Sequence, residues 1–315
     1  MNFAEYQQRA AKTDQQQLTH KWSEEETSRA MLIPLLGLAG EVGELVSEYK
    51  KRLRDGESYS SFPERIGEEL GDLLWYLTNT STKFGLALED IAADNLKKVE
   101  ARWASPDQAR RRYFDESYPP NERLPRQMEV TISSDSQGKT QMFVDGKQVG
   151  NDLTDNRYDD DDYRFHDVFH LAYMAVLGWS PVMRRLLRHK RKSQTKVDEV
   201  EDGGRASVIE EGIAAMVFSY AEGYGLLKGA RGVSHVLLRT IKRMTDHLEV
   251  KERTEGEWEQ AIMLGFGIWH TVRANGGGRL QVDLEKRSIE VIGQLPAPAS
   301  YRQAVQSDWP PPSRA

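Results

Sequence analysis

The sequence predicts a mainly α-helical protein of two domains, an all-α N-terminal bundle and a mostly helical α+β domain with a small antiparallel sheet. Three observations support this. Apolar residues recur at helical spacing through residues 1–103 and again between 163 and 274. Alternating apolar residues, typical of strands, occur near 128–149 and 279–292. Prolines at 106, 119, 120 and 125 separate the two patterns and predict a linker.

Length and composition set the broad class. A chain of 315 residues favours two domains, and a net charge of −6 indicates nothing specific about nucleic acid. The absence of cysteine excludes disulfides and thiolate metal sites. We find no apolar run of membrane-spanning length and no signal pattern at the N-terminus. We therefore expect a cytoplasmic protein that binds no membrane.

The first domain is expected to contain four helices, at residues 2–12, about 30–54, from Pro63 until Gly85 breaks the third, and 88–103. Pro34 fits the first turn of the second helix, where a missing N–H does no harm. Gly37, Gly40 and Gly43 recur along it, which predicts close approach by a partner helix or ligand. Such a bundle is too small to bury all its apolar faces. We expect two or more copies to pack together, as a dimer or tetramer.

Two carboxylate pairs with equal spacing lie on the second and third helices. Glu41 and Glu44 form the first pair, and Glu69 and Asp72 the second. Residues three apart share one side of a helix, and both pairs flank an apolar stripe at the same angle. Packing through these stripes would bring four carboxylates together at the rim of the core. The stripes are Leu35, Leu38, Val42, Leu45 and Tyr49 on one helix and Ile66, Leu70, Leu73 and Leu77 on the other.

Four clustered carboxylates need a neutralising partner. Protonation would serve, but Mg²⁺ prefers oxygen ligands and is commonly held by a few carboxylates, waters and substrate phosphates. A single pair would be read as ordinary surface charge, whereas two matched pairs favour the metal. We predict Glu41, Glu44, Glu69 and Asp72 as ligands of Mg²⁺, which Mn²⁺ can replace. Glu48, one turn further, could add a ligand, but a solvated side chain is favoured.

Five blocks of the first domain form a specific pattern: NFAEYQ at 2–7, GLAGEVGE at 37–44, EELGDLLWYL at 68–77, LEDI at 88–91 and NLKKVEAR at 95–102. On these blocks residues 1–103 resemble a MazG-type nucleoside triphosphate pyrophosphohydrolase, a member of the all-α NTP pyrophosphatase group that includes the all-α dUTPases. The resemblance implies a Mg²⁺-dependent cut between the α and β phosphates. The products would be a nucleoside monophosphate and pyrophosphate.

Roles for individual residues follow from chemistry and from the resemblance. Bound Mg²⁺ would bridge phosphate oxygens and orient an attacking water. Glu41 and Glu44 are both candidates to take the proton from that water. Asn95 and Lys98 match the family's Asn-x-x-Lys, which implies contact with sugar, base or phosphate. Trp75 can stack on a base, although an aromatic residue there is more often part of the core.

The second domain is not assigned to a family from its sequence. Asp145-Gly146 between two alternating runs predicts a tight hairpin turn. Helices are expected at about 163–177, 181–191, 205–228, 234–249 and 255–274. The expected divisions are a first domain 1–104, a linker 105–126, a second domain 127–295 and a proline-rich tail 296–315.

The second domain carries its own candidate site. His166 and His170 lie one helical turn apart, a spacing that suits a transition metal, and Asp167 adds a hard ligand. Glu210 and Glu211 interrupt an apolar helix and need a cation, a basic side chain or a metal. The motif only partly resembles the HD phosphohydrolases, which need further separated ligands. A second metal or hydrolase site and buried polar packing or ligand binding both stay open.

The strongly basic run 184–193 lacks interleaved aromatic residues, so a solvated helix is favoured over nucleic-acid binding. The function we expect is Mg²⁺-dependent hydrolysis of NTPs or dNTPs, with a second domain for specificity, regulation or a second step. One alternative is a nucleotide sensor without turnover. Another is a metal-dependent phosphohydrolase centred on His166, Asp167 and His170.

Overall fold

The computed structural model describes residues 1–15, 24–103, 113–135 and 137–293. The chain divides into two compact units, residues 1–100 and 101–315. A mainly α-helical architecture with one small antiparallel sheet confirms the predicted fold class. The proline-rich tail 296–315 and the first part of the expected linker, 105–112, lie outside the described residues.

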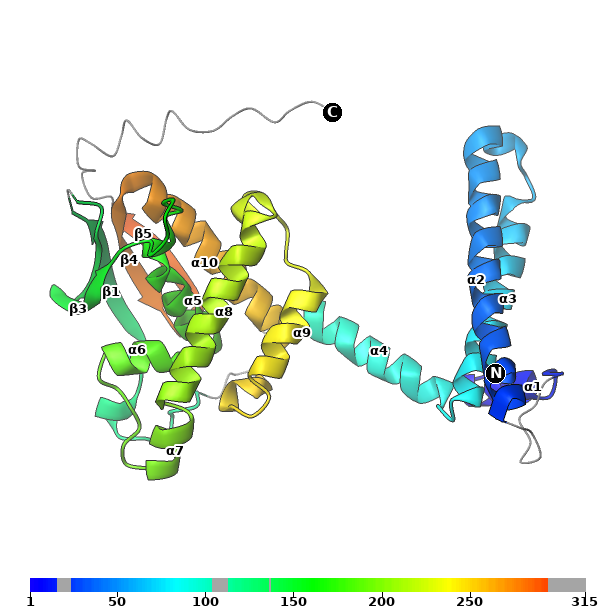
Figure 1. Ribbon diagram of the computed structural model, residues 1–315, viewed down its shortest axis with the longest axis horizontal. Coiled ribbons are helices and arrows are strands. Elements are labelled where there is room, and N and C mark those ends of the chain that lie inside the picture. The colour runs from blue at the N-terminus through cyan, green and yellow to red at the C-terminus, as the bar shows by residue number, and fades with distance from the viewer. Residues whose placement is uncertain (16–23, 104–112, 136, 294–315) are drawn as a thin grey trace. The chain divides into compact units, whose positions relative to one another are not determined.

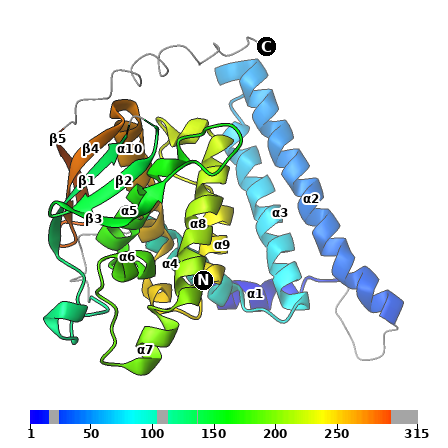
Figure 2. The same cartoon turned by 60° about the vertical axis from the view of Figure 1, so that its left-hand side comes forward.

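Unit 1 is organised around a long helical hairpin, in which α2 and α3 run side by side (Figures 1 and 2). Pro63 stands in the first turn of α3, as predicted. The second helix begins earlier than predicted, so Pro34 lies inside it and not in its first turn. The helices are α1 (Phe3–Ala11), α2 (Glu24–Asp55), α3 (Phe62–Lys83) and α4 (Leu88–Trp103).

The face through which α2 meets α3 is rotated from the predicted stripes. Glu41, Glu48 and Glu69 lie on the inner, less exposed side of the hairpin. Val42 and Leu70, both assigned to the stripes, are 48% and 51% exposed. The carboxylates therefore stand within the inter-helix contact, and part of each apolar stripe faces outward.

At Gly37, α2 approaches α3 closely. A Cβ added there would lie 2.1 Å from Cε1 of Tyr76, whereas one added at Gly40 or Gly43 would meet nothing within 4 Å. The predicted close approach is thus confirmed at Gly37. Within the described part of this chain, nothing closely approaches Gly40 or Gly43.

We expect Gly37→Ala to lower the free energy of unfolding by about 1–3 kcal/mol, because the added methyl group displaces the Tyr76 ring. Gly40→Ala is the matched control on the same helix. It should raise stability by up to about 1 kcal/mol, since alanine favours the helix and has open space. Urea unfolding followed by circular dichroism measures both changes. Equal effects of the two substitutions would contradict the packing described.

The helical segment Ser28–Ser58 is apolar and long enough, by length and composition alone, to cross a membrane. Its mean hydropathy reaches 1.5 over 18 residues, of which 11% are buried. This corrects the expectation that no apolar run attains such a length. The same segment carries Glu41, Glu44 and Glu48. An apolar helix that packs against another protein surface has the same composition.

Unit 2 contains a five-stranded sheet of order β3-β2-β1-β4-β5, with every neighbouring pair antiparallel (Figure 2). The Asp145-Gly146 turn has φ of 49° and 77°, as a tight hairpin turn requires. Val130 of β1 lies opposite Leu280 of β4, which joins the two ends of the domain. The strands are β1 (Gln127–Ser134), β2 (Thr140–Val144), β3 (Lys147–Leu153), β4 (Gly277–Asp283) and β5 (Ser288–Gly293).

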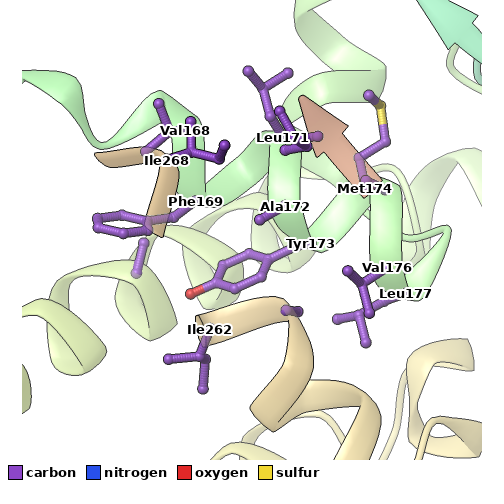
Figure 3. Packing of buried hydrophobic residues seen from close by; sticks show 14 of the residues in the cluster. Val168, Phe169, Leu171, Ala172, Tyr173, Met174, Val176, Leu177, Ile262 and Ile268 are labelled. Carbon is purple, nitrogen blue, oxygen red and sulfur yellow. The ribbon is translucent and has the colours of Figure 1, made fainter. Parts of the chain in front are cut away.

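The core of unit 2 is centred on α5 (Asp167–Leu177), which packs against α10 and the strands β4 and β5. Every residue from 168 to 177 is buried, so α5 has protein on all sides (Figure 3). The predicted helices are present, but four of them are shorter than predicted, α10 ends one residue later than predicted, and α7 was not predicted. The others are α6 (Pro181–Leu186), α7 (Thr195–Val200), α8 (Gly204–Glu222), α9 (His235–Met244) and α10 (Glu255–Asn275).

The basic run 184–193 is only partly solvated, and it is helical only as far as Leu186. Arg184 and Arg191 are 1% and 0% exposed. Nη2 of Arg184 lies 2.9 Å from Oδ2 of Asp115, and Nη2 of Arg191 lies 2.7 Å from Oδ1 of Asp202. Glu249 gives Arg191 a second carboxylate at 2.6 Å. Residues 113–126 thus contribute to the interior of unit 2 through Asp115.

Candidate functional site

The hairpin of unit 1 brings three of the four predicted carboxylates together. Glu41, Glu69 and Asp72 each offer an oxygen, and these oxygens lie within 4.8 Å of one another. The i,i+3 spacing places Glu69 and Asp72 on one side of α3, and Glu41 faces them from α2. Glu44, one turn beyond Glu41, is exposed and stands outside this acidic trio.

The electrostatics of the acidic trio call for a positive partner. Partial burial raises the pKa of Glu69, and the charges of Glu41, Glu44 and Asp72 raise it further. Close carboxylates without a cation favour protonation, so the site gains from a proton or a metal ion. A donor set made only of carboxylate oxygens fits Mg²⁺, which completes its shell with water and phosphate oxygens.

Glu48 is already neutralised within the chain. It is 5% exposed and accepts hydrogen bonds from Nζ of Lys51, at 2.5 Å, and from the Tyr59 hydroxyl. The hydrogen bond from Lys51, followed by that from Tyr59, lowers the pKa of Glu48. The expectation of a solvated Glu48 was therefore wrong. The lysine three residues later was the signal that could have shown it.

A cavity of about 150 Å³ lies further along the same hairpin. Trp75 and Tyr76 of α3 line it together with Ile33 and Pro34 of α2. Nε1 of Trp75 also donates a hydrogen bond of 2.8 Å to Oγ1 of Thr13. Trp75 is therefore held by a hydrogen bond and at the same time lines a cavity.

The two residues taken from the Asn-x-x-Lys motif are not brought to the acidic trio by any described contact. Asn95 is exposed on α4. Among the residues that the structure describes, no hydrogen bond or ion pair joins Asn95 to Glu41, Glu69 or Asp72. The side chain of Lys98 lies outside the described part of the chain.

The second predicted cluster does assemble in unit 2. His166 at the start of α5, His170 one turn later and Glu211 of α8 offer ligand atoms within 4.8 Å of one another. Glu210 is fully buried behind them, with Oε1 2.8 Å from Nδ1 of His170. Oδ1 of Asp167 lies 3.9 Å from Nε2 of His166. Residues more than 40 positions apart in sequence thus meet at one place.

Burial and neighbouring charges act differently on the two histidines. Burial lowers the pKa of His166, and the charge of His170 adds to that effect. Burial would also lower the pKa of His170, but Glu210 and Glu211 outweigh it and raise the value to about 10. The hydrogen bond from His170 lowers the pKa of Glu211.

Comparison with known proteins bears on both units. Residues 30–105 match the MazG nucleotide pyrophosphohydrolase domain, and residues 109–294 match the MazG C-terminal domain. The second domain, unassigned from its sequence, is thereby recognised. The NFAEYQ block at 2–7 precedes the matched range.

One curated protein shares part of the chain. The Gene 37 protein of Mycobacterium phage L5 is 33% identical over 69 residues, which cover 21% of this chain and 60% of that protein. This chain thus spans less than two thirds of the relative's length. No solved structure matches the chain significantly. The two domain matches together cover most of the sequence, and the chain belongs to the MazG family, with a nucleotide pyrophosphohydrolase domain followed by a MazG C-terminal domain.

Proposed function

We propose that this protein hydrolyses nucleoside triphosphates, NTPs or dNTPs, to the nucleoside monophosphate and pyrophosphate, with Mg²⁺ or Mn²⁺ as cofactor. The observation that supports this most is the convergence of Glu41, Glu69 and Asp72 from two helices, within a region that matches a pyrophosphohydrolase domain. The C-terminal domain would then supply specificity, regulation or a second step.

Each carboxylate has a distinct part in this proposal. Glu41, Glu69 and Asp72 hold the metal ion. When bound, the ion neutralises phosphate charge and orients a water for attack. Glu44 is exposed beside the acidic trio and outside it, so its carboxylate can accept the proton that this water loses. The bond broken is the anhydride link between the α and β phosphates.

Glu44→Gln should therefore lower kcat by about 100-fold or more while Mn²⁺ affinity changes little, because the amide cannot accept the proton. Steady-state pyrophosphate release gives kcat, and electron paramagnetic resonance of Mn²⁺ gives the affinity. A variant that loses Mn²⁺ binding would make Glu44 a ligand and not the base.

The cavity beside Trp75 is the proposed place for the base. Its volume of about 150 Å³ suits one planar ring, since an apolar cavity of comparable size holds benzene. Its nearest lining residues lie about two helical turns from Glu41 along α2 and about one turn from Asp72 along α3, which leaves the sugar and phosphates to span the interval. The aromatic lining can stack on the ring of any base, so it does not by itself select one base over another.

Exposed apolar side chains of unit 1 support an oligomer. Along α2 the side chains of Leu36, Val46 and Leu53 are 61%, 61% and 71% exposed. Surfaces of this kind mark protein–protein contacts. We infer that two or more copies, a dimer or tetramer, cover these faces, and that the apolar segment Ser28–Ser58 serves this contact in a cytoplasmic protein that binds neither membrane nor nucleic acid.

The double substitution Leu36→Glu/Val46→Glu should convert the oligomer to monomer, because each buried carboxylate would lose its hydration without a partner. Lys97→Glu is the control, since it adds negative charge at an exposed polar position of unit 1 outside α2. Light scattering coupled to size-exclusion chromatography reports the mass. A wild-type protein that is monomeric at micromolar concentration would contradict the inference.

The function itself is tested by product analysis on the full-length protein. Canonical and modified NTPs and dNTPs are incubated with Mg²⁺, and the products are separated by chromatography. Pyrophosphate with monophosphate supports the proposal. Nucleotide binding without turnover would instead indicate a sensor, and inorganic phosphate or free nucleoside would place the chemistry in unit 2.

A further inference from the structure

His166, His170 and Glu211 of unit 2 are arranged like the ligands of a metal centre, and hydrogen bonds already hold both histidine rings in place. We propose that His166, His170 and Glu211 bind one divalent first-row transition metal ion such as Zn²⁺, and that the ion's open positions face a cavity that takes a small phosphate-bearing anion. Two histidines and one carboxylate are a set that catalytic zinc and non-haem iron sites use, with coordination positions left for water or ligand.

Hydrogen bonds orient both imidazoles toward the same point. Nδ1 of His166 lies 2.9 Å from the carbonyl oxygen of Tyr163, which only accepts, so Nδ1 carries the proton and Nε2 keeps its lone pair. The Tyr163 ring stacks on His166 with centroids 4.5 Å apart and fixes the ring plane. Nδ1 of His170 is likewise committed to Glu210 at 2.8 Å.

Glu210 is an outer-sphere carboxylate. It is 0% exposed and accepts hydrogen bonds from Oγ of Ser180 at 2.6 Å and from the backbone N–H of Val182 at 2.8 Å, besides the one from His170. A carboxylate that holds the far nitrogen of a ligating histidine fixes its tautomer and strengthens it as a ligand. Glu210 is thus placed to direct Nε2 of His170 at the metal.

The distances from Glu211 to the two histidines fit one ion. Oε2 of Glu211 lies 3.2 Å from Nε2 of His170 and 3.8 Å from Nε2 of His166. Ligand atoms about 2.0–2.2 Å from a common ion lie about 3–4 Å apart. The charges also balance, because a divalent ion with two neutral histidines offsets the carboxylates of Glu210 and Glu211. Without the ion, a proton on His170 would offset the charge of only one of these two carboxylates.

The ligand class follows from the surroundings of the three side chains. His166 and Glu211 line a cavity of about 360 Å³, whose wall also includes Arg185. Arg185 and Glu211 line a second cavity of about 290 Å³ together with Lys190. Arg185 is exposed and makes no ion pair with any described residue. Lys190 is already paired with Asp198 at 2.6 Å, so Arg185 is the cation available to a ligand. A metal ion beside a guanidinium group selects an anion with several oxygens, as phosphate groups have.

The metal is tested first, with Zn²⁺ alone as the probe. Full-length protein is stripped with a chelator and titrated with Zn²⁺ by calorimetry. We expect about one tight equivalent per chain, weakened at least about 100-fold by His166→Ala and by Glu211→Gln. These side chains are 13% and 41% exposed, so both variants should fold, which thermal unfolding verifies.

Two controls locate the ion. His247→Ala, at an exposed histidine outside the cluster, should bind Zn²⁺ as the wild type does. Glu69→Gln, in the acidic trio of unit 1, should do the same, which separates this proposal from the proposed function. Co²⁺ should give the visible spectrum of a four- or five-coordinate nitrogen-containing site, and not that of an all-oxygen octahedral one. Wild-type protein that retains no Zn²⁺, or variants that bind it equally, would refute the site.

The anion is tested with inorganic phosphate. Binding by calorimetry should require Zn²⁺ and should weaken at least about tenfold in Arg185→Gln, which keeps its Zn²⁺. Phosphate affinity that is independent of both Zn²⁺ and Arg185 would overturn the assigned ligand. Phosphate binding in this test does not depend on whether unit 1 hydrolyses triphosphates, because Arg185→Gln changes a residue of unit 2.

Discussion

Glu69→Gln is expected to reduce pyrophosphate release by at least about 100-fold, since even loss of an outer contact at a metal site commonly costs 10- to 100-fold. Glu69 is the member of the acidic trio whose pKa is raised, first by partial burial and then by its acidic neighbours. The amide keeps the shape of the side chain but removes the charge that attracts the ion. Activity should therefore fall without loss of the helical circular dichroism signal.

Glu68→Gln is the matched control, one residue away on the same helix. Glu68 is exposed, pairs with Arg65 at 2.8 Å and stands outside the acidic trio, so its substitution should leave activity within about twofold of wild type. Mg²⁺ should raise the melting temperature of wild type and of Glu68→Gln but not of Glu69→Gln, because only a native state that binds the ion is stabilised by it. Full activity in Glu69→Gln would remove the acidic trio from the mechanism.

The largest effect on stability is expected from Arg191→Leu, with a loss of about 3–5 kcal/mol in the free energy of unfolding. Arg191 is 0% exposed and donates to Asp202, Glu249 and the carbonyl oxygen of Phe114. Without the guanidinium, buried Asp202 keeps its charge but loses its strongest partner. Chemical denaturation of the full-length chain measures the change.

Lys196→Ala is the comparison for a surface ion pair. Lys196 and Glu199 are 79% and 68% exposed, so this pair should contribute no more than about 1 kcal/mol. A loss from Arg191→Leu as small as that from Lys196→Ala would show that the buried network does not stabilise unit 2.

The same network predicts a dependence on pH. Burial would raise the pKa of Asp115, but Arg126 and Arg184 outweigh it and hold the value below the usual range. A carboxyl group with a lowered folded-state pKa stabilises the protein above its unfolded pKa of about 4, and that contribution is lost as the pH falls through the folded value. Asp115→Asn should therefore be less stable than wild type at pH 7. The difference in the free energy of unfolding between the two proteins should become smaller below about pH 4.

The parts of the fold that depend on local pattern could be predicted from the sequence. The last helix of unit 1 was predicted at 88–103 and is found as Leu88–Trp103. The Asp145-Gly146 turn and the antiparallel strands around it follow from residues close in the chain. Helical spacing also indicated that Glu69 and Asp72 share a side of α3, because that geometry is internal to one helix, whereas on α2 only Glu41 of the predicted pair joins them.

What the sequence could not show depends on contacts between distant segments. The helical wheel placed Val42 and Leu70 in the hairpin interface, but the approach of Tyr76 to Gly37 rotates the contact toward Glu41 and Glu69. The basic run appeared solvated because the partners of Arg191 are 11 and 58 residues away. The sequence indicated that Glu210 needs a partner. Its position behind His170 could not be predicted, because it depends on the packing of α5 against α8.

We propose that Glu41, Glu69 and Asp72 hold the ion that contacts the triphosphate. The measurement that tests this proposal most directly is the anomalous scattering of Mn²⁺ in crystals grown with a triphosphate whose α–β bridge is a methylene group. We expect an anomalous peak about 2.1–2.2 Å from oxygens of all three carboxylates, in contact with the phosphates. A well-occupied Mn²⁺ bound to the phosphates elsewhere, with these three side chains turned to solvent, would contradict it.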